Sequence, residues 1–212
     1  MPEMLPDIKY IYDEKRKTVD SDNSLYMIQM YPDERYFSDW ESRNKYISAV
    51  EKLVRGSDQY KKYINHLKKV KGLNYCQVMP NVTDQDAPIE MHHGPILTLY
   101  DICDIMIEYY LVKKYKISTF RIATAVLEEH FQERVQTVML CETVHQQVHN
   151  GEIWLNYEMA HGDLNKFVKK YGIALSDEYI NKINRYIDKS ISNDTYGGEI
   201  LELNDLLFKL ID

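Results

Sequence analysis

Hydrophobic residues recur at three- and four-residue intervals over several stretches of this chain, and Gly, Pro or polar clusters separate the stretches. The first helical stretch runs from Ser38 to Gly56, and the second covers residues 60–69. A longer stretch, 97–114, is apolar nearly all round, which predicts a buried helix. Ser118 is a suitable N-cap for the next helix. Four more helices are predicted, over residues 120–131, 164–171, 177–190 and 201–211, with Gly197-Gly198 between the last two.

Alternating or β-branched stretches interrupt the helices and predict a few strands. Residues 7–30 alternate around a polar centre, as two strands joined by a turn do. A strand-like run over residues 73–79 leads to a Pro-Asn turn, and a short strand is predicted at Ile89. Residues 135–140 are mostly apolar and partly β-branched, and they lead directly into a helix that ends at Asn150-Gly151. The pattern therefore predicts a helix-rich α+β fold without internal repeats.

The composition is that of a folded chain with an acidic balance. Its 212 residues are 44% hydrophobic and 28% charged in mixed signs, which supports a core and argues against long disorder. A net charge of -7 disfavours nucleic-acid binding through a broad basic surface. Two lysine clusters, within 61–71 and 113–116, are interpreted as solvated helix faces. The 18 tyrosines, with many Lys, Asn and Ile, are typical of an AT-rich genome such as that of a phage or a low-GC bacterium.

Cysteine usage and the N-terminus bear on the compartment. Cys76, Cys103 and Cys141 are scattered and form no CxxC pair, which fits a reducing environment. No apolar run approaches the roughly 20 residues that a membrane span needs. The N-terminal residues lack the basic flank and apolar centre of a signal peptide. We therefore expect a cytoplasmic protein, in the host cytoplasm if it is phage-encoded, without membrane contact.

Four of the seven histidines fall into two clusters whose spacing suits metal chemistry. His92 and His93 are adjacent at the end of the short strand. His145 and His149 are four residues apart, so on a helix both side chains project from one face. Neutral imidazole is a frequent ligand of zinc and nickel and a frequent general base near neutral pH. Because adjacent strand residues point to opposite faces, His92 and His93 are not expected to chelate one ion together.

The order of these elements resembles the HNH nuclease family, whose core is a two-stranded ribbon and a helix around one metal ion (the ββα-metal fold). The likeness rests on residues 89–93 and 140–151, with Leu140, Cys141, His145 and His149 in the family's register. Among variants of the family, the DNase colicins are the most similar in form. The resemblance implies an HNH-type core over residues 88–151. A hairpin and helical region, 1–87, would precede it, and a helical region, 152–212, would follow.

The resemblance also implies roles for individual residues. His92, His145 and His149 would bind one divalent ion (zinc, nickel, manganese or magnesium), and imidazole ligands favour the first three. His93 would be the general base. Gln136 stands in the register of the family's central asparagine, which braces the base. The implied function is metal-dependent DNA cleavage that leaves 5′-phosphate ends.

Other residues near the motif have two interpretations each. Glu90 lies two residues before His92, hence on the same strand face, and could orient a metal ligand or simply be exposed. Cys141 could supply a thiolate or fill a small buried space. His66, His130 and His161 are interpreted as ordinary histidines, because nothing in their spacing supports ligation; Tyr100, Tyr109 and Tyr110 are interpreted as packing residues.

The chain also departs from the family pattern. Val144 replaces the family's second cysteine, and the insert between the two halves is long and helical. Without CxxC pairs, no structural zinc of the family's kind is predicted. Two alternatives follow: an inactive HNH-like structural or host-interaction protein of a phage, or a structural zinc site made by Cys141, His145 and one of His92 or His93. If the chain is a nuclease, DNA is the expected partner. If it is a structural or host-interaction protein, the expected partner is another protein or a larger assembly.

Overall fold

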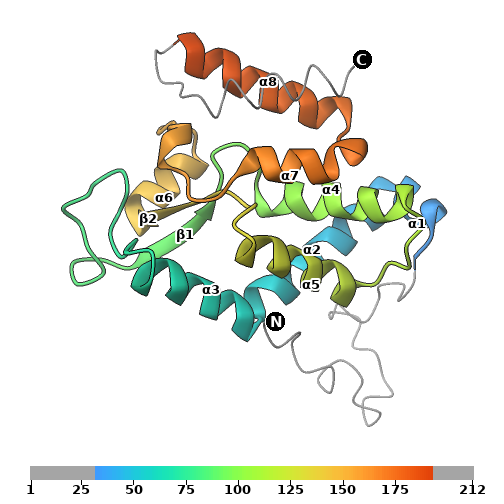
Figure 1. Ribbon diagram of the computed structural model, residues 1–212, viewed down its shortest axis with the longest axis horizontal. Coiled ribbons are helices and arrows are strands. Elements are labelled where there is room, and N and C mark those ends of the chain that lie inside the picture. The colour runs from blue at the N-terminus through green and yellow to red at the C-terminus, as the bar shows by residue number, and fades with distance from the viewer. Residues whose placement is uncertain (1–31, 193–212) are drawn as a thin grey trace.

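The computed structural model describes residues 32–192, over which the chain is helix-rich with one small sheet (Figure 1). The predicted α+β class is therefore confirmed. The sheet consists of β1 (Ile89–His93) and β2 (Thr137–Cys141). The helices are α1 (Glu34–Ser38), α2 (Trp40–Gly56), α3 (Asp58–Lys69), α4 (Leu99–Val112), α5 (Thr119–Phe131), α6 (Glu142–His149), α7 (Leu164–Tyr171) and α8 (Asp177–Ser192), with short 3-10 turns η3 (Tyr157–Met159) and η4 (Gly172–Ala174).

Local capping explains where the helices begin and end. The Ser118 hydroxyl accepts a hydrogen bond from the Arg121 backbone N–H at 3.3 Å, which confirms the predicted N-cap of α5. Thr98 and Asp101 form a reciprocal capping box, so α4 begins at Leu99 and not at residue 97. Gly151, with φ +75°, follows the C-cap of α6 and supplies the left-handed residue that ends the helix.

The two strands form an antiparallel ribbon that runs from the pair Ile89–Cys141 to the pair His93–Thr137. Because paired residues share a face, His93 and Thr137 lie on one face while His92 and Val138 lie on the other. The helix α6 follows β2 directly and packs on both strands. Figure 1 shows α6 on one side of the ribbon and α3 on the other.

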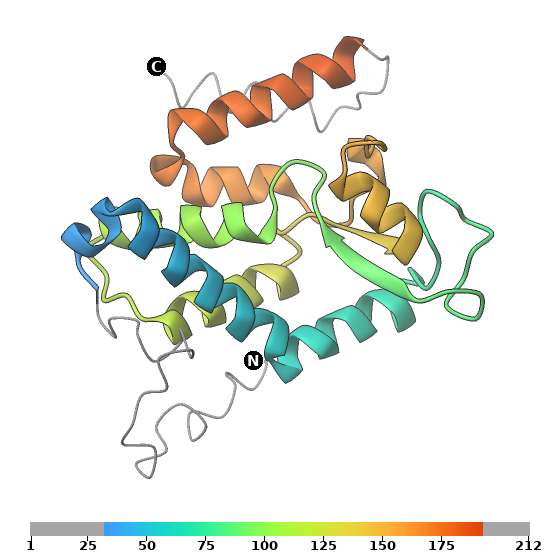
Figure 2. The ribbon, with the colours of Figure 1, turned by 180° about the vertical axis from the view of Figure 1, so that it is seen from behind.

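A helical body continues the core away from the ribbon. The helix α2 packs against α4 and α5, and the buried side chains of α4 include Ile105, Met106 and Ile107. The helix α8 lies across α7 (Figure 2) and is joined to α4 by an ion pair of 2.5 Å between Lys182 and Asp101. Within residues 32–192, no helix is both long and apolar enough to cross a membrane.

One predicted strand is wrong, and two predicted elements fall outside the described residues. Residues 73–79 form only an isolated bridge, between Tyr75 and Thr83. The Gln77 backbone N–H donates to Met139, but the Gln77 side chain then accepts the Met139 N–H, at 2.7 Å. Because a side chain takes the place of the next backbone partner, the ladder does not extend. The predicted strands within 7–30 and the predicted helix 201–211 lie outside residues 32–192.

Candidate metal centre

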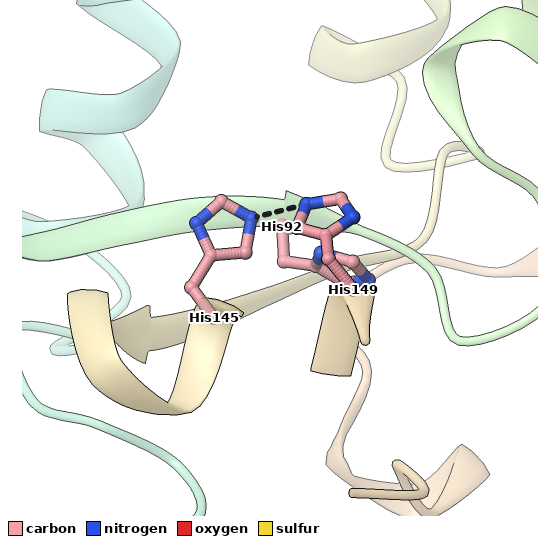
Figure 3. A group of neighbouring side chains, drawn as sticks. All are labelled: His92, His145 and His149. Atoms are coloured by element: carbon pink, nitrogen blue, oxygen red, sulfur yellow. Dashed lines mark hydrogen bonds between the residues drawn. The ribbon is translucent and has the colours of Figure 1, made fainter. Parts of the chain in front are cut away.

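Three of the predicted ligands converge on one point (Figure 3). His92 projects from the α6-facing side of β1, and His145 and His149 project from one face of α6. One potential ligand atom from each residue lies within 4.8 Å of the others. The Nε2 atoms of His145 and His149 are 3.0 Å apart. The fold therefore brings these three imidazoles together, and their role as metal ligands stays a prediction.

Glu90 braces one of the three imidazoles. Its Oε2 accepts a hydrogen bond from His145 Nδ1 at 2.6 Å, because a carboxylate can only accept. The proton on Nδ1 leaves the lone pair of His145 on Nε2, which faces His149. A carboxylate that holds the outer nitrogen of an imidazole is the usual support of a metal-bound histidine. Of the two interpretations of Glu90, the geometry favours the orienting one.

Electrostatics favour the neutral form of two imidazoles in this cluster, those of His92 and His149. Burial, followed by repulsion from His145 and His149, lowers the pKa of His92 to about 4. Burial and the nearby His145 also lower the pKa of His149. His92 is 9% exposed, whereas His149 lies on the surface. Since only a neutral imidazole can bind a metal, the lowered pKa values leave His92 and His149 ready to do so at neutral pH.

The donor set fits a transition-metal ion. With metal–nitrogen distances of about 2.0–2.1 Å, tetrahedral ligands stand about 3.3 Å apart. The 3.0 Å separation of His145 and His149 needs only a small adjustment to reach that value. Three imidazoles suit zinc or nickel, and they suit magnesium poorly because magnesium prefers oxygen. His92, His145 and His149 are the residues that would hold such an ion.

Gly94 makes room for the His92 ring. Its φ is +153°, and a Cβ at this position would lie 3.0 Å from His92 Nε2. A side chain there would therefore meet both an unfavourable backbone conformation and the ring itself.

We expect Gly94→Ala to weaken zinc binding about tenfold to a hundredfold, the range seen when the support of a ligand is disturbed. Competition with a coloured chelator measures the affinity. Gly56→Ala is the matched control, because a Cβ at Gly56 would meet nothing within 4 Å. Equal zinc affinity for the native chain and Gly94→Ala would show that the ring position does not depend on this glycine.

His93, the predicted general base, lies on the opposite face of the ribbon. His93 is only 5% exposed, and its Nε2 is 2.9 Å from His130 Nε2. His130 in turn donates from Nδ1 to the Val126 carbonyl at 2.7 Å. The Tyr60 ring stacks on the His93 ring, with the two ring centroids 6.0 Å apart. Strand alternation correctly predicts that His92 and His93 separate. A ring enclosed in this way is not accessible to a phosphate group, so its placement does not fit the role of base.

His130 is the residue that sequence reasoning missed. His93 and His130 are 37 positions apart in the chain, all of α4 lies between them, and no motif connects the two. Only the tertiary contact between the C-terminal end of α5 and β1 brings them together. His130 has 0% exposure, and burial lowers its pKa to about 4.

The buried His130 predicts a loss of stability in acid. Its folded-state pKa of about 4 lies below its usual 6.5, so the unfolded chain takes up the proton first. The contribution of His130 to the stability is therefore fully present above about pH 6.5 and is lost as the pH falls to about 4, by on the order of 3 kcal/mol. Urea unfolding at a series of pH values measures this slope. In His130→Gln the slope should be smaller, whereas an unchanged slope would assign it to other groups.

Gln136 and Cys141 do not join the histidine cluster. Gln136 is 3% exposed, and neither amide atom has a hydrogen-bond partner within residues 32–192. Its backbone carbonyl accepts from Gly94, but its side chain makes no hydrogen bond to His93. Cys141 is buried and pairs with Ile89, on the ribbon face away from His92. The structure therefore offers no support for a zinc site that contains Cys141.

Comparison with known families defines the class of protein. Residues 4–210 match the family of bacteriophage G278-like virion proteins, so this is a phage protein of the virion class. The chain belongs to the bacteriophage G278-like virion protein family. No curated protein and no solved structure matches it. The phage origin that the composition suggested is confirmed, and the predicted location in the host cytoplasm stays a prediction.

Proposed function

We propose that this virion protein binds one divalent transition-metal ion through His92, His145 and His149 and uses it to hydrolyse phosphodiester bonds in DNA. The observation that carries the proposal is the convergence of three imidazoles from β1 and α6. Its second support is the resemblance of this ribbon and helix, in sequence and order, to the HNH nucleases.

The number of ligands favours catalysis over a purely structural ion. Structural zinc sites are commonly closed by four protein ligands, whereas catalytic sites have three and leave a position open. Among residues 32–192, only His92, His145 and His149 form a group with metal-ligand spacing. Because His149 lies on the surface, the open position would be accessible to a substrate.

The residues of this site would have separate roles in the proposed reaction. His92, His145 and His149 hold the ion, and Glu90 fixes the tautomer of His145. When bound, such an ion supplies Lewis-acid stabilisation of a phosphate oxygen and activates water. The proposal assigns no step to His93, whose ring is enclosed by His130 and Tyr60.

Plasmid nicking tests the proposal. With zinc, nickel, manganese or magnesium supplied in turn, we expect the native chain to nick supercoiled plasmid with at least one ion. His149→Ala should lose nicking and metal binding together, because only two of the three imidazole ligands remain to hold the ion. His66→Ala is the matched control, since His66 lies on α3 outside the cluster. Nicking by His149→Ala at the native rate would assign the activity to another site or to a contaminant.

A second candidate function is structural. The membership of a virion protein family, the net charge of -7 and the enclosed His93 favour a particle component in which the ion serves stability alone. Metal-binding energy then contributes to folding, because the site exists only in the folded chain. Stoichiometric zinc binding without nicking under any of the four ions would favour this function and reject hydrolysis.

A further inference from the structure

A second surface feature lies at the end of the molecule away from the histidine cluster. The helix α1 stands beside the end of α4 and the loop that leads to α5, as both views show (Figures 1 and 2). Between them is a groove with a cavity volume of about 630 Å³. The residues that matter for its chemistry are Arg35, Leu111, Lys114, Tyr115, Lys116 and Ile117. This surface is hereafter called the α1 groove.

The α1 groove has apolar walls and a rim with more basic than acidic side chains. Leu111 and Ile117 contribute aliphatic surface, and Tyr115 is 52% exposed. Val112, 48% exposed, lines an adjoining hollow of about 360 Å³. Clustered exposed apolar residues of this kind mark interaction surfaces more often than isolated ones do.

The positive charges of the rim have no acidic partner in the described part of the chain. Arg35, Lys114 and Lys116 are exposed, and none of them forms an ion pair within residues 32–192. Two acidic residues, Asp33 and Glu34, also line the groove. The Asp33 carboxylate accepts the N–H groups of Arg35 and Tyr36 and so caps α1, whereas the exposed Glu34 offsets one of the three cations and leaves the rim basic on balance. An acidic segment with apolar side chains is therefore the complementary ligand.

The sequence of residues 199–212 has this chemistry. It contains Glu199, Glu202, Asp205 and Asp212 against the single cation Lys209. On the helix that the sequence predicts there, residues at spacings of three and four share one face; these are Leu203, Leu206, Leu207 and Leu210. The family match extends to residue 210, so nearly all of this segment belongs to the family's common sequence.

The path of the chain favours docking on a second copy. The helix α8 starts after η4, near the α1 end of the molecule, and runs toward the α6 end (Figure 1). Its 16 residues carry the chain about 24 Å in that direction. Residue 199 is seven steps along the chain from Ser192 and can lie at most about 25 Å from it. Its return to the start of α8 would therefore need residues 193–198 to be almost fully extended, a constraint that docking on a second copy does not impose.

We propose that the α1 groove binds the acidic segment 199–212 of a second copy of this chain. The contact joins two different surfaces, so each copy can donate a segment and accept one. Such head-to-tail contacts build rings or open filaments, which suits a component of a particle.

Sedimentation of the full chain, with charge reversal on each side, tests the proposal. We expect native self-association that increases with concentration and becomes at least tenfold weaker in Lys114→Glu/Lys116→Glu and in Glu202→Lys/Asp205→Lys. Mixing these two variants should restore association, because the reversed charges complement each other. Lys62→Glu/Lys69→Glu, on the exposed face of α3, is the control and should associate like the native chain.

Cross-linking of mixed isotope-labelled and unlabelled copies identifies the occupant. A zero-length carbodiimide should join Lys114 or Lys116 of one copy to Glu202 or Asp205 of another. A cross-link only within one copy would show that the chain fills its own groove and would overturn the proposal. A monomeric native chain without either cross-link, or association unaffected by both charge reversals, would also overturn it. None of these outcomes depends on metal binding or nicking.

Discussion

Zinc ions should raise the midpoint of thermal unfolding of the native chain by on the order of 10 °C and should leave His145→Ala unchanged. A ligand that binds only the folded state stabilises it by about 4 kcal/mol at a thousand times its dissociation constant. For a chain of this size, each kcal/mol shifts the midpoint by about 2–4 °C. His145 is the sharpest residue to remove, because it contacts both His149 and Glu90.

Two controls accompany the zinc experiment. His66→Ala should keep the full shift, because His66 lies outside the histidine cluster. Glu90→Gln should keep part of it, since an amide can still accept from His145 Nδ1 but carries no charge. An equal shift in the native chain and in His145→Ala would mean that zinc acts somewhere else.

The replacement of His93 by alanine should reduce the free energy of unfolding by about 3 kcal/mol. The substitution leaves His130 Nε2 buried without its partner and opens a space beneath Tyr60. An unsatisfied buried polar atom costs about 1–3 kcal/mol, and loss of a buried ring adds the cost of a cavity. Urea unfolding of the two chains, with the zinc site empty in both, measures the difference.

The same variant separates the two roles considered for His93. The resemblance to HNH nucleases predicts that His93→Ala keeps the metal and loses cleavage, whereas the burial of the ring predicts a less stable chain. Asp58→Ala provides a control for nonspecific effects, because Asp58 is exposed in the first turn of α3. A variant as stable as the native chain, but inactive, would favour the role of base over that of a packing residue.

The sequence predicts much of the histidine cluster because its spacing is local. The interval of four residues between His145 and His149 is a property of any helix, and strand alternation separates His92 from His93. The lead from β2 into α6 follows from the mostly apolar, partly β-branched run 135–140 that precedes the helical histidine pair. That His92 on β1 meets the two histidines of α6 could be expected only from the resemblance to a known family, because it depends on contacts between segments that are distant in the chain.

Features that depend on packing between distant segments could not be predicted. The pairing of His93 with His130 requires the C-terminal end of α5 to meet β1, and nothing in the spacing of either histidine indicates it. The run 73–79 has strand composition, but Gln77 pairs with β2 through its side chain and the ladder stops. The α1 groove is likewise invisible in the sequence, since α1 and the α4–α5 loop come from separate segments.

The direct test of this account is X-ray absorption at the zinc edge on the one-to-one complex of zinc with the full chain. Coordination by His92, His145 and His149 predicts three imidazole nitrogens at about 2.0–2.1 Å and no sulfur. A sulfur neighbour at about 2.3 Å would instead place a cysteine such as Cys141 on the ion, and a spectrum without imidazole scattering would show that zinc binds elsewhere. Either of those spectra would contradict the three-histidine centre.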